Sequence, residues 1–149
     1  MNNRTFYNEV LTDHNLHPMH KCELPDADMV HEGVNPSCGD DIWLQLKMDG
    51  DVIAGGAFRG DGCAISQASA DMMLDLIIGK TKEEALALTD TFLRMIKEDI
   101  SEEEMETLEE ASSLQDIAHM PSRVKCAVLA WRTLEEMIAG DKDTPATTE

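Results

Sequence analysis

The stretch DIWLQLKMDGDVIAGGAFRG, residues 41–60, decides the fold because its pattern is that of a β-hairpin. Apolar and polar side chains alternate through residues 41–48, which predicts a strand buried on one face. Asp49-Gly50 is a strong two-residue hairpin signal, and it predicts a returning strand over residues 52–59. The Gly55-Gly56 pair in that second strand indicates a bulge or a close packing contact. The hairpin leads the chain back toward Cys38.

Segments with helical spacing surround the hairpin, and a short strand over residues 29–34 precedes it. Helices are predicted at residues 4–13, at 63–79, from Thr81, from Ser101, and at 121–140. Strands and helices do not alternate, so the sequence predicts an α+β fold, with a small antiparallel three-stranded sheet packed against about five helices. We expect one domain over residues 1–149, ending in a disordered tail at 141–149.

Composition limits the classes of function. The chain has 149 residues, of which 42% are hydrophobic, so it can build a core without disulfide bonds. It contains neither an apolar stretch of the roughly 20 residues that span a bilayer nor the apolar centre of a signal peptide, and we therefore expect a cytoplasmic protein without membrane contacts. A net charge of -18 with only 12 Lys and Arg disfavours nucleic-acid binding and favours partners with a basic face.

Three of the four cysteines share a local setting that indicates metal chemistry. Cys38 lies on a Pro/Gly turn, Cys63 follows a Gly turn and opens a helix, and Cys126 is placed in the first turn of the last helix. Helix N-termini favour thiolates, and Asp40 can add an oxygen ligand, which together would suit a tetrahedral zinc ion. Without a Cys-x-x-Cys pair, the spacing leaves open the alternative that these cysteines are small buried apolar residues.

Three other features receive no chemical role. His14, His17 and His20 are interpreted as surface side chains around Pro18. Cys22, in the connecting segment, is assigned to packing. The acidic run over residues 98–110 is interpreted as a solvated helix face or, alternatively, a docking surface.

Four strings of residues together resemble the SufU family, within the NifU N-terminal and IscU-like superfamily. They are FYNEVLTDH at 6–14, NPSCGDDI at 35–42, FRGDGCAISQAS at 58–69 and RVKCAVLAW at 123–131. The resemblance covers nearly the whole chain and implies an IscU/NifU-N-like fold. It also implies that Cys38, Asp40, Cys63 and Cys126 are zinc ligands.

The resemblance further implies a zinc-dependent sulfurtransferase. Such a protein takes persulfide sulfur from a SufS-type cysteine desulfurase, for which it is both co-substrate and activator, and supplies downstream cluster-assembly proteins. Scaffold members of the superfamily usually carry His directly before the third cysteine, where this chain has Lys125. The acidic segment at 98–110 looks like the insertion typical of SufU. Both departures favour the sulfur acceptor.

Within this hypothesis Cys38 is the sulfur-accepting residue, because its turn can move without unwinding a helix. Arg123 could stabilise a persulfide, or could form an ordinary surface salt bridge. Two alternatives remain. One is a scaffold that holds a nascent iron–sulfur cluster on the same three cysteines. The other is a zinc hydrolase with an open position for water, which would disappear if Asp40 is a ligand.

Overall fold

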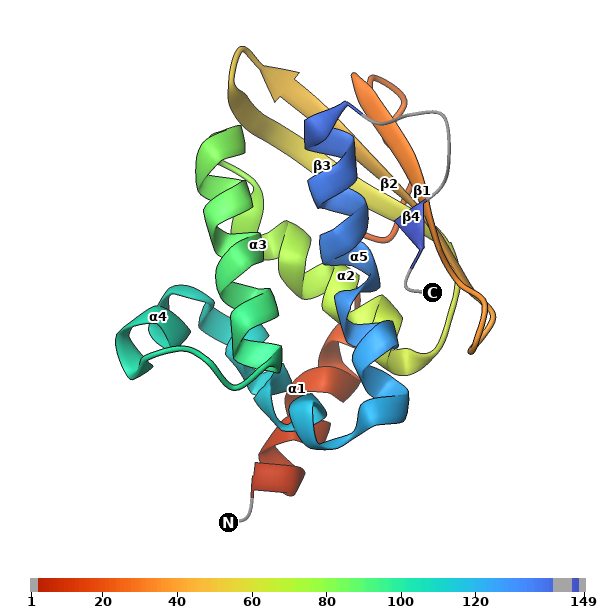
Figure 1. The fold of residues 1–149 in the computed structure, drawn as a ribbon. Coiled ribbons are helices and arrows are strands. Elements are labelled where there is room, and N and C mark those ends of the chain that lie inside the picture. Colours follow the sequence, from red (N-terminus) through yellow and green to blue (C-terminus); the bar gives the residue numbers. More distant parts are fainter. Residues whose placement is uncertain (1–2, 141–145, 148–149) are drawn as a thin grey trace.

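Helices cover one face of a small sheet in the computed structural model of the protein (Figure 1). The structure describes residues 3–140 and 146–147, with side chains from residue 9 onward. The helices are α1 (Asn3–Leu16), α2 (Ala64–Ile77), α3 (Lys82–Ile96), α4 (Glu102–Thr107), the 3₁₀ helix η1 (Glu109–His119) and α5 (Pro121–Ala139). The strands are β1 (Met29–Asn35), β2 (Asp40–Asp49), β3 (Val52–Asp61) and β4 (Ala146–Thr147). The predicted α+β class is confirmed.

The sheet has one strand more than predicted. Its order is β3-β2-β1-β4, with antiparallel pairs along the hairpins and β4 parallel to β1 through Gly33 and Ala146. The prediction of three antiparallel strands is therefore wrong in count. The fourth strand comes from the tail that we expected to be disordered, because the open edge of β1 offers backbone groups that residues 146–147 can pair with. The remainder of that tail lies outside the described residues.

The β2–β3 hairpin forms as predicted, although its turn is displaced by one residue. Asp49 pairs with Val52, so the loop consists of Gly50 and Asp51, and Gly50 has the positive φ of 63° that such turns require. The register shifts after Lys47, opposite the predicted bulge. A Cβ on Gly56 would lie 2.7 Å from Leu74 Cδ2, so the close packing contact is also confirmed.

Two capping boxes begin the helices that the sequence predicted at these positions. Thr81 caps α3 with Glu84, and Ser101 caps α4 with Glu104. Helix α4, which covers residues 102–107 of the acidic run, buries none of its residues. The guanidinium of Arg94 pairs with Glu104 and thereby ties α4 to α3. Helix η1, which follows, was not predicted.

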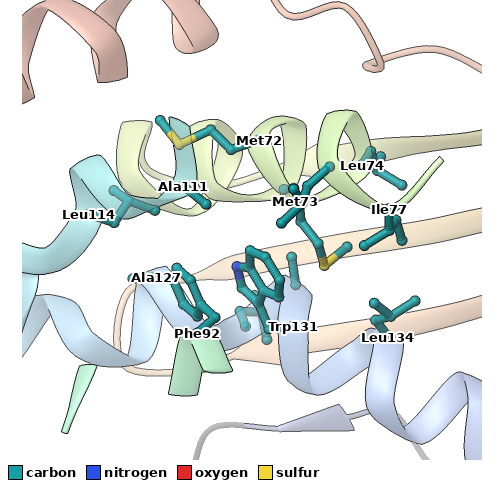
Figure 2. Close-up of a cluster of buried hydrophobic side chains, with 14 of the residues drawn as sticks. Met72, Met73, Leu74, Ile77, Phe92, Ala111, Leu114, Ala127, Trp131 and Leu134 are labelled. Atoms are coloured by element: carbon teal, nitrogen blue, oxygen red, sulfur yellow. The ribbon is translucent and has the colours of Figure 1, made fainter. Parts of the chain in front are cut away.

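The core centres on Trp131 of α5, which lies in one cluster with residues of α2, α3 and η1 (Figure 2). Its ring stacks on Phe92 with centroids 4.2 Å apart. Its Nε1 donates to Ser69 Oγ at 3.0 Å, and Ser69 Oγ donates to the carbonyl of Ala127 at 2.6 Å. Truncating a buried aromatic residue of this kind costs about 3–5 kcal/mol. These contacts hold α2 against the turn of α5 that carries Cys126.

His14 is buried, contrary to the predicted surface position. Only 7% of it is exposed; Nδ1 lies 2.7 Å from Asp71 Oδ2 and Nε2 lies 2.5 Å from Glu110 Oε2. Burial lowers the pKa of His14, but the hydrogen bonds to Asp71 and Glu110 outweigh it, so the pKa is raised. The two carboxylates come from α2 and η1, far away in sequence, and no local pattern indicates the contact. His14 thus pins α1 to both helices.

Among the described residues, no helix is both long and apolar enough to cross a membrane.

Candidate metal centre

Three segments that are distant in sequence bring sulfur and oxygen atoms together beside the helical face of the sheet. One ligand atom from each of Cys38, Asp40 and Cys126 lies within 4.8 Å of the other two. The two sulfurs, Cys126 Sγ and Cys38 Sγ, are 3.4 Å apart. Cys63 falls outside this group of three, but its thiol interacts with that of Cys126. The arrangement therefore offers three close donor atoms with a fourth beside them.

Cys38 is held by a tight turn between β1 and β2. The carbonyl of Asn35 accepts from the backbone N–H of Cys38 at 3.2 Å and of Gly39 at 3.0 Å. Gly39 has a φ of 74°, a conformation that glycine adopts without strain. Cys38 is exposed on this turn, so an external reactant can reach its thiol.

Cys63 caps helix α2, as the sequence predicted. Its sulfur accepts from the backbone N–H of Ser66 at 3.4 Å, one of the unpaired donors of the first turn. The positive end of the helix dipole also favours a thiolate at this position.

Cys126 differs from the prediction that it lies in the first turn of the last helix. Helix α5 begins at Pro121, so Cys126 occupies the second turn, away from the free N–H groups. Burial raises the pKa of the Cys126 thiol, and hydrogen bonds with Cys38 and Cys63 add to the rise. A thiolate at this buried position needs positive charge beside it, and metal coordination is one interaction that supplies it.

The carboxylate of Asp40 is buried and held on both oxygens. Oδ1 accepts from the backbone N–H of Cys63 at 2.7 Å and from the Ser66 hydroxyl at 3.2 Å. Oδ2 accepts from Asn35 Nδ2 at 3.0 Å. A Cβ on Gly62 would lie 2.8 Å from Oδ1, so only a glycine leaves room for the carboxylate. These donors thus hold the carboxyl group of Asp40 in a defined orientation.

Arg123 lies at the site, at the start of α5. Its guanidinium donates to the sulfur of Cys126, and this bond raises the pKa of Arg123, as do the charges of Cys63 and Cys38. Stabilisation of a persulfide by Arg123 stays a prediction. Sequence reasoning assigned nothing to Asn35 and Ser66. The signal that could have identified them is their position, because each lies three residues from a candidate cysteine ligand in the same motif.

The residues fit a zinc ion by the chemistry of their donors. Structural zinc sites take four thiolate, imidazole or carboxylate donors, and the set of Cys38, Asp40, Cys63 and Cys126 supplies three sulfurs and one oxygen. The cradle around Asp40 accommodates a carboxylate without an uncompensated charge. The group of Cys38, Asp40 and Cys126 could therefore bind a metal.

Comparison with known proteins identifies the relatives of this chain. The chain matches the NifU-like N terminal domain over residues 6–143. It is 46% identical to the iron-sulfur cluster assembly scaffold protein IscU of Streptococcus pyogenes serotype M1 over 89% of this chain and 82% of that protein. It is 38% identical to the zinc-dependent sulfurtransferase SufU of Bacillus subtilis (strain 168) over 93% of this chain and 92% of that protein.

A solved structure shares the fold as well. It is that of a candidate iron-sulfur cluster assembly scaffold protein for the SUF system from Fervidobacterium islandicum AW-1. Its TM-score is 0.84 at 37% identity, covering 92% of this chain and 99% of that one. Fold and site define an α+β protein with a centre lined by cysteine and aspartate. The chain belongs to the NifU-like N-terminal domain family and, within it, to the SufU family.

Proposed function

We propose that this protein acts in iron–sulfur cluster assembly as a zinc-dependent sulfur acceptor. It would take persulfide sulfur from a SufS-type cysteine desulfurase, serve as co-substrate and activator of that enzyme, and supply downstream cluster-assembly proteins. The observation that carries the proposal is the meeting of one exposed thiol, Cys38, with the buried donors Asp40 and Cys126. The similarity to the Bacillus subtilis zinc-dependent sulfurtransferase adds support.

Three of the proposed ligands hold the metal in place, and the fourth, Cys38, reacts with the persulfide. Cys38, Asp40, Cys63 and Cys126 are the proposed zinc ligands. Zinc, when bound, keeps thiols deprotonated at neutral pH. Cys126 is buried and Cys63 caps a helix, so neither can leave its place without disrupting the fold. Cys38 lies on a turn and can swing outward.

The transfer step proposed for Cys38 is a thiol–disulfide exchange. The thiolate of Cys38 attacks the outer sulfur of the persulfide on the desulfurase, and a new S–S bond forms. The bond between that sulfur and the desulfurase cysteine breaks, and the cysteine leaves as a thiolate. Cys38 then carries the persulfide. Arg123, which already donates to Cys126, is placed to stabilise the negative charge on the transferred sulfur.

The partner is expected to present a basic surface around its persulfide. The net charge of -18 steers this protein toward such a surface and away from other acidic proteins. The cytoplasmic location stays a prediction.

A scaffold for nascent iron–sulfur clusters is the second candidate, because the Streptococcus pyogenes relative carries that name. Lys125 and the acidic segment at residues 98–110 favour the sulfur acceptor instead, by the resemblance stated above. Metal analysis of the protein purified without oxygen separates the two. Stoichiometric zinc supports sulfur transfer, whereas labile iron with acid-labile sulfide supports the scaffold.

The decisive test of the acceptor combines single Cys→Ser variants with a purified SufS-type desulfurase and cysteine. Mass spectrometry locates the added sulfur, and alanine release measures activation. Cys38→Ser should lose both signals. Cys22 is exposed, contrary to the predicted packing role, so Cys22→Ser should behave as the wild type. If Cys38→Ser accepts sulfur normally and Cys126→Ser does not, the acceptor is the buried thiol and the proposed division of roles is wrong.

A further inference from the structure

Asn35 contacts three of the four candidate ligands, although no role has been assigned to it so far. It is fully buried at the end of β1, directly opposite Asp40 in the ladder with β2. Its backbone carbonyl accepts from Cys38 and so forms the turn that carries this thiol. Its side-chain Nδ2 donates to Asp40 Oδ2 at 3.0 Å and to Cys126 Sγ at 3.5 Å. One residue therefore links three of the four candidate ligands.

The chemistry of a primary amide suits this position. The NH₂ group has two N–H donors, so it can serve a carboxylate and a sulfur at once. It is also neutral, and it stabilises two anionic acceptors without adding charge to a site that already holds a carboxylate and several thiols. Asn35 Nδ2 donates to Asp40 Oδ2, while the Cys63 N–H and the Ser66 hydroxyl donate to Oδ1. Because both oxygens are held, the carboxylate cannot rotate. Such outer donors set the orientation of the ligands that they bind.

Asn35 contacts these ligands in two ways. Its side-chain Nδ2 donates to Asp40 and Cys126, the two buried donors, and its backbone carbonyl accepts from the N–H of Cys38 and so holds the exposed turn. The amide therefore acts on the ligand atoms of Asp40 and Cys126 directly, and the carbonyl acts on the backbone that carries Cys38.

We propose that Asn35 is a positioning residue of the metal centre. Its amide holds the side chains of Asp40 and Cys126 in place, and its carbonyl holds the turn of Cys38. The inference rests on the proposed zinc-dependent function and deepens it. It predicts that Asn35 variants change metal affinity and ligand geometry in addition to stability.

The experiment compares Asn35→Asp and Asn35→Ser with two controls. Asn15→Asp adds the same charge at an exposed position on α1. Thr133→Ala removes a buried hydroxyl from the contact between α5 and β1, outside the metal site. Thr133 Oγ1 lies so close to β1 that a Cβ on Gly33 would come within 2.0 Å of it. The readouts are Zn²⁺ affinity, measured by competition with a chelator, and the absorption spectrum of protein loaded with Co²⁺.

Asn35→Asp should weaken Zn²⁺ binding by about 10- to 100-fold, the usual effect of removing an outer-shell donor. The Co²⁺ d–d bands should shift because Asp40 is repelled, while the sulfur-to-cobalt charge-transfer intensity should still report three thiolates. Asn35→Ser, with a shorter donor, should shift the same bands and weaken Zn²⁺ binding to a smaller extent. Asn15→Asp should stay within about twofold of the wild type, and Thr133→Ala should lower the melting temperature alone.

The proposal is overturned if both Asn35 variants bind Zn²⁺ within twofold of the wild type with an unchanged Co²⁺ spectrum, even if they melt at lower temperature. That result would make Asn35 a packing residue like Thr133. If Asn35→Asp does not fold, Asn35→Ser decides. Sulfur acceptance by the wild type is measured separately. A wild type that binds zinc but accepts no sulfur would refute the proposed function, whereas the metal readouts would still decide the role of Asn35.

Discussion

Replacing Gly62 with alanine tests whether the carboxylate of Asp40 is held as tightly as the structure indicates. Gly62 precedes Cys63 and does not have a positive φ, so the substitution acts through space and not through backbone strain. The new Cβ would lie 2.4 Å from Ser66 Oγ and 2.8 Å from Asp40 Oδ1. Real Cβ atoms do not approach so closely, and both side chains are short. Both side chains must therefore move away from the new Cβ, Ser66 by more than Asp40.

The expected cost follows from the interactions that this movement breaks. Overpacking a filled site costs about 1–3 kcal/mol. A lost hydrogen bond to an ionised carboxylate adds roughly 1.5–3 kcal/mol, and the stiffer unfolded chain of an alanine variant offsets about 0.4–1 kcal/mol. The net destabilisation of Gly62→Ala should be about 1.5–5.6 kcal/mol, which lowers the melting temperature of a chain this size by roughly 3–22 °C. Zinc affinity should fall by about tenfold or more.

Thermal unfolding and chelator competition measure the two effects, with Gly55→Ala as the matched control. Its Cβ would meet only Lys47 Cβ at 3.8 Å, an ordinary contact, so its stability should stay within about 1 kcal/mol of the wild type. The reasoning about the cradle fails if Gly62→Ala and Gly55→Ala are equally stable and bind zinc equally well. If Gly62→Ala melts early but binds zinc normally, Asp40 is not a ligand.

Three further predictions concern zinc, Asp40 and His14. Chelation should lower the melting temperature, because zinc at 100 times its Kd contributes about 2.7 kcal/mol; an unchanged melting curve after verified zinc removal argues against a shared site. Asp40→Ala should retain zinc on three cysteines by metal analysis while persulfide formation slows, and complete loss of zinc would contradict this division. The pKa of His14 is raised above 6.5, so its ion pairs stabilise the fold fully below pH 6.5 and less as pH rises through the raised pKa. The stability advantage of the wild type over His14→Gln in urea unfolding should therefore be largest near pH 6 and shrink toward pH 9; an advantage that does not change with pH would refute the charged state.

Local patterns predicted most of the elements because each is specified by neighbours along the chain. The alternation in β2 and the two capping boxes depend on residues two to four positions apart, and these predictions are confirmed. Strand β4 was missed because two residues carry no period, and they become a strand only where the edge of β1 is open. Helix η1 was missed because a 3₁₀ segment lacks the spacing of an α-helix.

For the site, the motifs alone indicated which residue types could bind a metal, and the resemblance indicated which family carries them. The sequence by itself determined the turn of Cys38, the helix cap at Cys63 and the acidity of the whole chain. The tertiary structure decided that Cys126 is buried in the second turn of α5, that Asn35 donates to Cys126, and that His14 meets Asp71. These contacts join residues 57 to 91 positions apart. No local propensity encodes them, because they exist only after the stacking of Trp131 and the pairing of β1 with β2 have set the distance between the segments.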